Sequence, residues 1–199
     1  MKIAVLATDA QWEEITSNKN TGVYERMASV NWVEDANAYL VLKEDTSFGL
    51  AGHTVPVFVN AVATTLKKMQ AGRQVIRING WPGFLKRSHW EMAGEIDDIT
   101  RLVCSEMKKE VISVPDVPGL VTARVIAMIV NEAYYTLQEN ISTKEEIDTA
   151  MKLGTNYPYG PFEWAAKIGE HRLAQLLEIL SEKDASYTPA PLLKTVNIS

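Results

Sequence analysis

The segment Pro115-Asp116-Val117-Pro118-Gly119 divides the chain into two parts whose hydrophobic patterns differ. Proline cannot donate a backbone hydrogen bond and glycine readily adopts turn conformations, so such a segment ends regular secondary structure. Before it, short apolar runs alternate with amphipathic stretches, whereas after it the regular stretches have helical spacing. We therefore expect two domains, residues 1–115 and residues 116–199.

The first part has the pattern of an α/β domain with a mostly parallel sheet. Strands are expected where short, continuously apolar runs occur, at residues 3–7, 38–42, 55–59, 75–78 and 111–114. Helical spacing of apolar residues predicts a helix within residues 91–110 and a shorter one from Ala61 to Gln70. The stretch from Asn18 to Glu34 follows neither pattern, and we assign it no role.

The second part is expected to be entirely helical. Apolar residues from Leu120 to Leu137 cover almost the whole circumference of a helix, which is typical of a helix buried in a domain core or a subunit interface. Ser142 and Glu145 have the spacing of a capping box at the start of a helix that ends at Gly154. Gly160-Pro161 begins another helix, because proline is favoured in the first helical turn.

Composition and charge exclude several classes of function. The 199 residues are 46% apolar and 23% charged, with a formal net charge of −5 and no basic stripe, so we expect no nucleic-acid partner. The longest apolar stretch, Leu120 to Val130, is broken by Arg124 and is too short to span a membrane. The apolar run near the first residue ends at Thr8 and is too short for a signal peptide. A single cysteine, Cys104, allows neither an intrachain disulfide nor a cysteine-rich metal site, and we expect a cytoplasmic protein with no membrane partner and no metal.

Several segments of the second part have the order and spacing of known family motifs. They are Asp116-Val117-Pro118-Gly119 with Arg124, Asn131-Glu132-Ala133, Glu146-Ile147-Asp148, and Pro158-Tyr159-Gly160-Pro161-Phe162-Glu163 with Ile168-Gly169. On these residues the second part resembles the C-terminal domain of the 3-hydroxyacyl-CoA dehydrogenase family, whereas the first part is similar to that family only loosely, in strand order. The resemblance implies a reduced Rossmann-like domain followed by a helical domain through which family members usually dimerise. It also implies an activity in fatty-acid metabolism, the oxidation of an acyl-CoA 3-hydroxyl group with hydride transfer to NAD.

The sequence departs from the family at the turn that would bind NAD. Such a turn normally carries Gly-x-Gly-x-x-Gly, because glycine lets the backbone approach the pyrophosphate closely. Here the first strand is followed by Thr8-Asp9-Ala10-Gln11-Trp12-Glu13, and no glycine occurs before Gly22. Asp9 would lie at the start of a helix, where its carboxylate suits the helix dipole but repels a pyrophosphate. We expect the usual NAD site to be lost, and we assign no cofactor-binding residue.

The resemblance also locates the family's catalytic positions. The catalytic histidine of a His-Phe-Phe-Asn-Pro segment corresponds to Ile78 here, and a family asparagine near the start of the first long helix corresponds to Ala123. The orienting glutamate is retained as Glu91, if one residue is inserted, and an arginine beside the asparagine is retained as Arg124. The resemblance therefore makes Glu91 a candidate catalytic residue and Arg124 a candidate substrate-binding residue, in a chain whose catalysis is impaired.

His89 offers an alternative base. It lies two residues before Glu91, so both side chains would face the same side if the segment were extended. Such a histidine and carboxylate could form a catalytic pair, or His89 could be an ordinary surface or core residue. Trp81 and Phe84 are expected to cover the top of the sheet and to fill the old substrate cleft, which predicts no sizeable pocket near Glu91.

Three functions remain open at this stage. The first is a divergent relative that lacks tight NAD binding and hydride transfer but keeps a role in binding acyl-CoA or in assembly, as a homodimer. The second is an active NAD-dependent 3-hydroxyacyl-CoA oxidoreductase with an atypical site, with a second chain supplying the missing parts. The third is a structural subunit of a β-oxidation assembly. Positive charges at Lys67-Lys68, Arg73 and Lys86-Arg87 are candidates for contacts with CoA phosphates.

Overall fold

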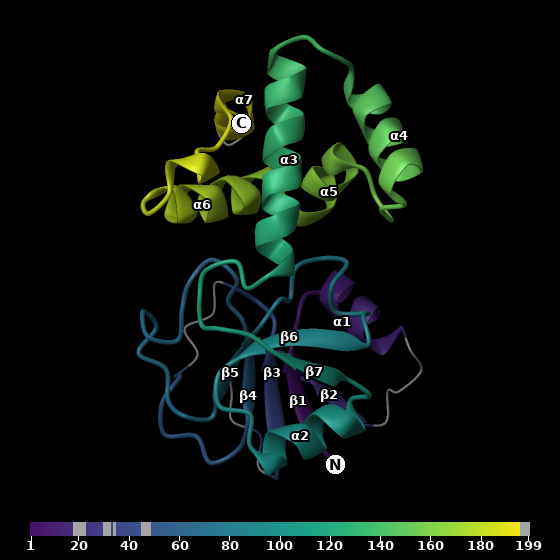
Figure 1. Ribbon diagram of the computed structural model, residues 1–199. Helices are drawn as coiled ribbons and strands as arrows, with labels where there is room; N and C mark the ends of the chain where they lie inside the picture. Colours follow the sequence, from purple (N-terminus) through teal and green to yellow (C-terminus); the bar gives the residue numbers. More distant parts are fainter. Residues whose placement is uncertain (18–22, 30–32, 34, 45–48, 196–199) are drawn as a thin grey trace. The chain divides into compact units, whose positions relative to one another are not determined.

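The computed structural model describes residues 1–17, 23–29, 33, 35–44 and 49–195 (Figure 1). In the stretch from Asn18 to Glu34, to which we assign no role, residues 18–22, 30–32 and 34 lie outside the described residues, and Tyr24–Arg26 forms a strand. The chain forms two compact units, Met1–Leu120 and Val121–Ser199. The segment from Pro115 to Gly119 belongs to the first of them.

The first unit is built on a mostly parallel sheet, as the sequence predicts. Its strand order is β2-β1-β3-β4-β5-β6-β7. The strands are β1 (Ile3–Leu6), β2 (Tyr24–Arg26), β3 (Ala38–Val41), β4 (Val57–Asn60), β5 (Val75–Ile78), β6 (His89–Ala93) and β7 (Glu110–Ser113). Strands β1 to β5 are parallel to one another, whereas β6 runs antiparallel to β5 and β7 runs parallel to β6. Each apolar run predicted as a strand forms one, and the α/β class of this unit is confirmed.

Alternate residues of the strands face two separate cores. In β1, Ile3 and Val5 belong to a core that also contains residues of the helices α1 (Asp9–Thr16) and α2 (Asp98–Glu106). Ala4 and Leu6 belong to the other core, where partly buried residues of the segment between β4 and β5 pack on the strands. Because both faces are covered, β1 and its parallel neighbours are apolar throughout, as is usual for parallel sheets.

One expectation for the first unit is wrong, and another is confirmed over fewer residues. The segment from Ala61 to Gln70 forms turns instead of a helix, since the Leu66 amide donates to the Asp116 carboxylate (2.9 and 3.1 Å) instead of continuing a helical ladder. The helix predicted within residues 91–110 is confirmed, but it spans only Asp98–Glu106, after an N-cap at Asp97.

The residues before that helix form a strand instead. In β6 the buried residues Trp90 and Met92 alternate with Glu91, which is the period-two pattern of a strand. The range 91–110, within which the sequence predicts a helix, therefore contains the end of this strand as well as the shorter helix α2. Ile99 and Leu102, taken from the sequence as part of its apolar face, are exposed.

Arg77 connects the segment from Pro115 to Gly119 to the sheet. Its side chain is 0% exposed, and its guanidinium pairs with Asp116 at 2.5 Å. The same guanidinium donates hydrogen bonds to the carbonyl groups of Ala61 (2.8 Å), Val62 (3.1 Å) and Val117 (3.3 Å). Burial lowers the pKa of Arg77, while Asp116 acts in the opposite direction. Sequence reasoning overlooked this residue, although a charge inside an apolar strand is a signal of a buried partner.

The second unit is entirely helical, as predicted. Its elements are α3 (Thr122–Gln138), α4 (Lys144–Thr155), α5 (Pro161–Ile168), α6 (Glu170–Ser181), the 3-10 helix η2 (Ala185–Tyr187) and α7 (Pro191–Thr195). Helix α3 packs against α5, α6 and α7, and this explains its nearly uniform apolarity. The capping box of α4 lies one residue later than the sequence analysis placed it: Thr143 caps the helix and accepts from the Glu146 amide (3.3 Å), while Glu146 accepts from the Thr143 amide (3.2 Å).

Candidate functional site

The carboxyl ends of strands β1 to β5 lie along one edge of the sheet, where α/β proteins commonly bind their ligands. Because β6 runs antiparallel to β5, its first residues also lie at this edge. The edge therefore brings together the turn after β1, the end of β2, the loop after β5 and the start of β6. The candidates Asp9, His89 and Glu91 lie at or near this edge, whereas the candidate Arg73 comes just before β5 and lies at the opposite edge.

The turn between β1 and α1 is closed by the chain's own side chains. Thr8 caps α1 by accepting a hydrogen bond from the Gln11 amide (3.3 Å), and the Gln11 side chain accepts one from the Thr8 amide (3.0 Å). These reciprocal bonds satisfy amide groups that a dinucleotide-binding turn directs at the pyrophosphate.

A carboxylate and a guanidinium lie beside this turn. Asp9, in the first turn of α1, forms an ion pair with Arg26, the last residue of β2. The hydrogen bond and the charge of Arg26 hold the pKa of Asp9 below its ordinary value. In Rossmann domains the end of β2 is close to the acidic residue that binds the ribose hydroxyls. In this chain the end of β2 carries Arg26 instead of an acidic residue, and Arg26 pairs with Asp9 at the start of α1. A pyrophosphate bound at a Rossmann turn would approach this same helix start.

The loop after β5, residues 79–88, is held by side chains from other parts of the edge. Glu14 of α1 accepts hydrogen bonds from the amides of Gly83 (2.9 Å) and Lys86 (3.2 Å). The indole of Trp81 donates to Glu44, in the segment after β3, at 3.0 Å. Trp81 is buried, and so is Phe84, in agreement with the expectation that aromatic rings fill this region. The expected absence of a pocket near Glu91 stays a prediction.

Gly80 allows this loop to lie directly against β4. Its amide donates to the Asn60 side chain (2.9 Å), and the Asn60 amide group donates in turn to the Leu42 carbonyl (3.0 Å). A Cβ atom on Gly80 would come within 2.6 Å of Asn60 Cγ, so only glycine fits without movement. The ends of β3, β4 and β5 are thereby bonded to each other at the ligand-binding edge.

Lys109, immediately before β7, holds the same loop from the other side. Its ammonium group is buried and donates to the carbonyl groups of Leu85 and Arg87, both at 2.8 Å. It also lies over the Trp90 ring, 4.8 Å from the centroid. Burial lowers the pKa of Lys109 to about 8, against the weaker opposite effect of Glu14. Sequence reasoning missed Lys109, because nothing in the local pattern distinguishes it from Lys108.

The structure places His89 and Glu91 in β6, on the same face of the strand as the alternation of an extended segment requires. His89 Nε2 lies 3.0 Å from the carboxylate of Glu110, its register partner in β7, and the other ring nitrogen contacts Ser88. The carboxylate that the structure places beside His89 is thus Glu110. A catalytic role of Glu91 or His89 stays a prediction.

In the second unit, Ala123 is buried in the first turn of α3, and Arg124 follows it. The Arg124 guanidinium lies over the Tyr187 ring, 5.4 Å from the centroid, and its Nε atom is buried without a hydrogen-bond partner among the described residues. A contact between Arg124 and a substrate stays a prediction.

The other motif residues of the second unit hold its helices together. Asn131 donates to the Thr188 carbonyl (2.9 Å) and accepts from the Ala190 amide (2.7 Å), so it binds the segment before α7 to α3. The Asp148 carboxylate accepts from the amides of Phe162 (2.8 Å) and Glu163 (3.2 Å), and it thereby caps α5 from α4. These contacts account for the motif residues without any ligand.

The basic residues considered for CoA phosphates are partly engaged within the chain. Arg73 forms an ion pair with Glu95. Arg87 is half-buried over the Phe84 ring, 4.4 Å from the centroid, and burial lowers its pKa. The structure gives no shared contact among these residues that would mark a phosphate site.

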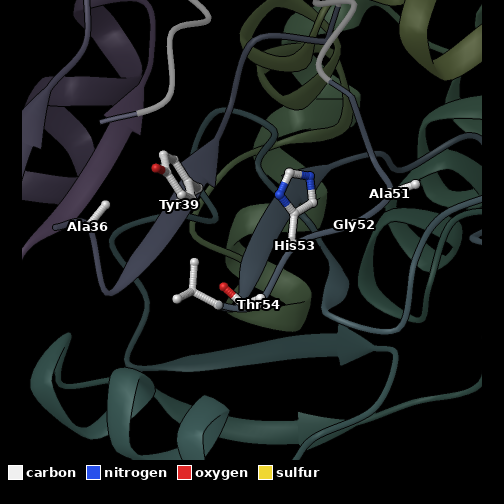
Figure 2. Close-up of a pocket in the computed structure, with 7 residues that line it drawn as sticks. Ala36, Tyr39, Ala51, Gly52, His53 and Thr54 are labelled. Atoms are coloured by element: carbon white, nitrogen blue, oxygen red, sulfur yellow. The ribbon is translucent and has the colours of Figure 1, made fainter. Parts of the chain in front are cut away.

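A cavity of about 350 Å³ lies at the opposite edge of the sheet (Figure 2). It is lined by residues before β3 and β4 and by Tyr39, and Figure 2 shows the His53 imidazole and the Thr54 side chain among its walls. The Tyr39 hydroxyl donates to the Val33 carbonyl at 2.9 Å, and His53 Nε2 contacts the Gly49 carbonyl at 2.5 Å. Among the described residues, these two polar groups of the cavity wall therefore bond to neighbouring backbone.

Among the described residues, no three His, Cys, Asp or Glu side chains are grouped as a metal ion would require. Within the same residues, no helix has both the length and the apolarity needed to cross a membrane.

Comparison with known proteins gives results that differ between the two units. Residues 119–198 match the family described as 3-hydroxyacyl-CoA dehydrogenase, C-terminal domain. The chain is 44% identical over 88 residues to 3-hydroxyadipyl-CoA dehydrogenase of Escherichia coli K12, an alignment that covers 43% of this chain and 18% of that protein. It is 38% identical over 91 residues to 3-hydroxybutyryl-CoA dehydrogenase of Bradyrhizobium diazoefficiens, covering 45% of this chain and 31% of that protein. The matched part of the chain is therefore less than a third of the length of either relative.

Solved structures extend the likeness to both units. A 3-hydroxybutyryl-CoA dehydrogenase from Escherichia coli K12 matches 95% of this chain and 43% of its own, with a TM-score of 0.61 and 27% identity. The (S)-3-hydroxybutyryl-CoA dehydrogenase of Ralstonia eutropha matches 98% of this chain and 92% of its own, with a TM-score of 0.72 and 19% identity, which shows the shared fold. The first unit is thus Rossmann-like in structure.

Proposed function

We propose that this chain, which belongs to the 3-hydroxyacyl-CoA dehydrogenase family, is a catalytically impaired member that binds acyl-CoA but does not use NAD. In this proposal it acts in fatty-acid metabolism as a cytoplasmic homodimer. The single observation that carries the proposal is the closed turn between β1 and α1, where Thr8, Gln11 and Asp9 satisfy or block the groups that would hold a pyrophosphate.

The residues of hydride transfer support the same proposal. The family's catalytic histidine corresponds to Ile78, whose side chain is buried in the core shared with α1 and α2. The family's asparagine corresponds to Ala123, whose methyl group cannot donate a hydrogen bond. A hydride transfer from a 3-hydroxyl group needs a base to take the hydroxyl proton, and neither position supplies one.

Titration of the purified chain with NADH tests the loss of NAD binding. We expect no saturable change in nicotinamide fluorescence or in tryptophan emission up to millimolar NADH. The 3-hydroxyadipyl-CoA dehydrogenase of Escherichia coli K12, which is named for its dehydrogenase activity, serves as the positive control. Saturable binding in the micromolar range would overturn the proposal, because the closed turn would then not exclude the cofactor.

A second candidate function is an active oxidoreductase whose site is completed by another chain. One observation favours it: the relatives that match the helical unit are named as dehydrogenases. NADH-dependent reduction of acetoacetyl-CoA, followed at 340 nm with and without added cell extract, distinguishes the two. Activity that requires the extract favours this second function over the first. The third possibility, a structural subunit of a larger assembly, needs no small-molecule binding at all.

The homodimer is proposed to form through the helical unit. Val121 and Val125, at the start of α3, are exposed although α3 is otherwise largely buried. Exposed apolar residues on one helix side commonly mark a contact with a partner. Light scattering at micromolar concentration should give twice the chain mass of 22.2 kDa, and Val125→Asp should shift the population toward the monomer. A wild-type protein that is strictly monomeric would contradict this part of the proposal.

A further inference from the structure

Strand β7 is the last strand of the sheet, and within the part of the chain that the structure describes no strand pairs with its outer side. It spans Glu110–Ser113, of which Val111 is partly buried and the other three residues are exposed. Figure 1 shows β6 and β7 side by side in the first unit. An edge strand of this kind presents backbone amides and carbonyl groups to another extended chain.

The hydrogen bonds between β6 and β7 identify the backbone groups that remain at this edge. The amides of Glu110 and Val114 donate to carbonyl groups of β6 and of the residue before it (2.8 and 3.0 Å). Because alternate residues of a strand direct their backbone groups to opposite sides, Glu110, Ile112 and Val114 face β6. The amides and carbonyl groups of Val111 and Ser113 therefore face outward.

The residues on either side of β7 limit its outer edge to these two positions. Before the strand, the Lys109 amide donates to the Cys104 carbonyl at 2.8 Å, so this donor is used within the chain. After the strand, Pro115 has no amide hydrogen. Val111 and Ser113 are therefore the outward-facing residues that offer both a donor and an acceptor.

These groups are self-complementary in one antiparallel register. In an antiparallel pair, opposed residues that exchange both hydrogen bonds alternate with opposed residues that exchange none. A second copy of β7 in which Val111 and Ser113 of the two copies oppose each other uses every outward donor and acceptor. A two-fold axis at Val111 would instead oppose Ser113 to Lys109, whose amide is already used. An axis at Ser113 would oppose Val111 to Pro115, which has no amide hydrogen.

The axis of the favoured register passes between the Ile112 side chains of the two copies. Ile112 is 45% exposed, whereas its neighbour Val111 packs on the other face of the sheet against the core that contains α2 residues. Opposed residues that exchange no hydrogen bonds form the closer kind of pair, with Cα atoms ~4.5 Å apart. Each Ile112 would therefore cover the other, and this contact explains an exposed isoleucine in an edge strand.

The charges beyond the two ends of β7 also favour this arrangement. Because the two copies run antiparallel, the start of one strand lies beside the end of the other. At the start, Lys108 and Arg101 line a surface cavity of about 340 Å³. At the end the chain continues to Asp116, whose side chain is 28% exposed. Continued beyond the strand, the register places Lys108 opposite Asp116 of the second copy, so opposite charges lie near each other at both ends.

We propose that the outer edge of β7 is a contact between two copies of this chain, whose sheets join antiparallel about a two-fold axis at Ile112. This contact is separate from the homodimer proposed for the helical unit, and it requires neither acyl-CoA nor NAD. Because each strand contributes only four residues, the contact is small and belongs to the weak, concentration-dependent class. Both copies use the same surface, so the contact closes on two sheets.

Disulfide formation tests the register directly. Ile112→Cys places two thiols at the axis, where the separation of the Cα atoms suits a disulfide. On mild oxidation this variant should form linked dimers about tenfold faster than Ile99→Cys, because the contact raises the effective concentration of the thiols. Ile99 is 54% exposed on α2 and lies outside the contact, and the buried Cys104 is present in both variants. Equal rates would overturn the proposal, because random collision would then account for both.

Sedimentation velocity measures the contact without the helical-unit dimer when the variant Val125→Asp is used. We expect this variant to self-associate at hundreds of micromolar. Adding Ile112→Lys should weaken that association about tenfold or more, because like charges then meet at the axis. Adding Ile99→Lys instead is the matched control and should change it less than twofold. Thermal melting shows whether each variant is folded.

Substitution of Ser113 tests the backbone hydrogen bonds. Ser113→Pro removes an amide that faces away from β6, so it leaves the hydrogen bonds between β6 and β7 in place. In the Val125→Asp background it should weaken association about tenfold, whereas Ser113→Ala, which keeps the amide, should change it less than twofold. If Ser113→Pro does not fold, Ile112→Lys and the disulfide rates decide the matter.

The outcomes separate this contact from the functions proposed above. A Val125→Asp variant that stays monomeric at hundreds of micromolar would overturn the β7 contact and leave the helical-unit dimer standing. Association that neither Ile112→Lys nor Ser113→Pro weakens would also overturn it. Loss of the micromolar dimer on Ile112→Lys alone would support the β7 contact and contradict a dimer formed through the helical unit.

Discussion

The two units keep different parts of the family's sequence pattern, and the contacts of each part explain why. In the helical unit the motif residues hold the fold: Asn131 binds the segment before α7, and Asp148 caps α5. In the sheet unit the family's glycine loop and histidine would serve a ligand, and here those positions carry Thr8, Asp9 and Ile78. The helical unit thus keeps motif residues that hold the fold, whereas the sheet unit lacks the glycine loop and the histidine that the family resemblance implies.

At the edge of the sheet, side chains from several elements bond to one another's backbone. Glu14, Asn60 and Lys109 each bond to the loop after β5 or to a neighbouring strand end. Such contacts satisfy buried backbone groups of the loop after β5. The comparison therefore predicts that polar residues of the sheet unit stabilise the fold as strongly as the motif residues of the helical unit.

The largest effect is expected at Arg77, whose charge is fully buried. Arg77→Met removes the cation paired with the Asp116 carboxylate and the donor to three carbonyl groups, and it should lower the free energy of unfolding by about 3–5 kcal/mol. Urea denaturation followed by tryptophan fluorescence measures this change. Arg73→Met, which breaks the exposed pair with Glu95, is the matched control and should cost less than about 1 kcal/mol. Equal effects of the two variants would show that the buried pair does not hold the first unit together.

A comparable effect in the helical unit is expected at Gly160. A Cβ atom there would overlap the Asp148 side chain, which caps α5. Gly160→Ala should therefore displace Asp148 and cost about 2–3 kcal/mol, through loss of the cap and local strain. Thermal unfolding with far-UV circular dichroism reports it. A change below about 0.5 kcal/mol would mean that this motif glycine has a reason other than packing, such as contact with a ligand.

Stability should also depend on pH through Lys109. Its pKa is lowered to about 8 in the folded state from an ordinary value of 10.5. Between these values the unfolded chain binds a proton that the folded chain has lost, so stability rises with pH. Between pH 8 and pH 9.5 we expect a gain of about 1–2 kcal/mol from this group. Urea denaturation at several pH values measures it, and Lys109→Met, which lacks the group, should not show this rise; an unchanged slope in the variant would exclude Lys109 as its source.

Much of the fold could be predicted from the sequence because its signals are local. Continuous apolar runs such as residues 3–6 identify buried parallel strands, and the start of α5 follows from Gly160-Pro161. The strand β6 was missed because its five residues lie next to a helix with the same apolar content. The two-residue alternation of buried positions in β6 is visible only when residues 89–93 are read separately from the residues of α2.

The site was less predictable, since its contacts join residues far apart in the chain. Glu91 could be found from the family resemblance, but its neighbours across the sheet depend on the register of β5, β6 and β7. The partner of His89 is Glu110, which lies opposite it in the parallel pair of β6 and β7. The distance between two residues along the chain does not predict such a pairing. The Asn79 Nδ2 atom is buried with no hydrogen-bond partner among the described residues, and this too is visible only after folding.

The smallest expected effect tests whether the helical unit has a partner at α4. Gly154 lies within α4, and a Cβ atom there would meet nothing within 4 Å in this chain. Because glycine weakens a helix interior, Gly154→Ala should stabilise the chain by about 0.5–1 kcal/mol if nothing else approaches this position. Thermal unfolding and light scattering on the same sample measure stability and association together. If Gly154→Ala instead weakens the dimer, a second copy must approach the α4 backbone at this glycine. In that case the helical unit would have a role in assembly as well as in folding. The two units would then differ because the helical unit keeps a contact with a second copy, whereas the sheet unit is proposed not to bind NAD.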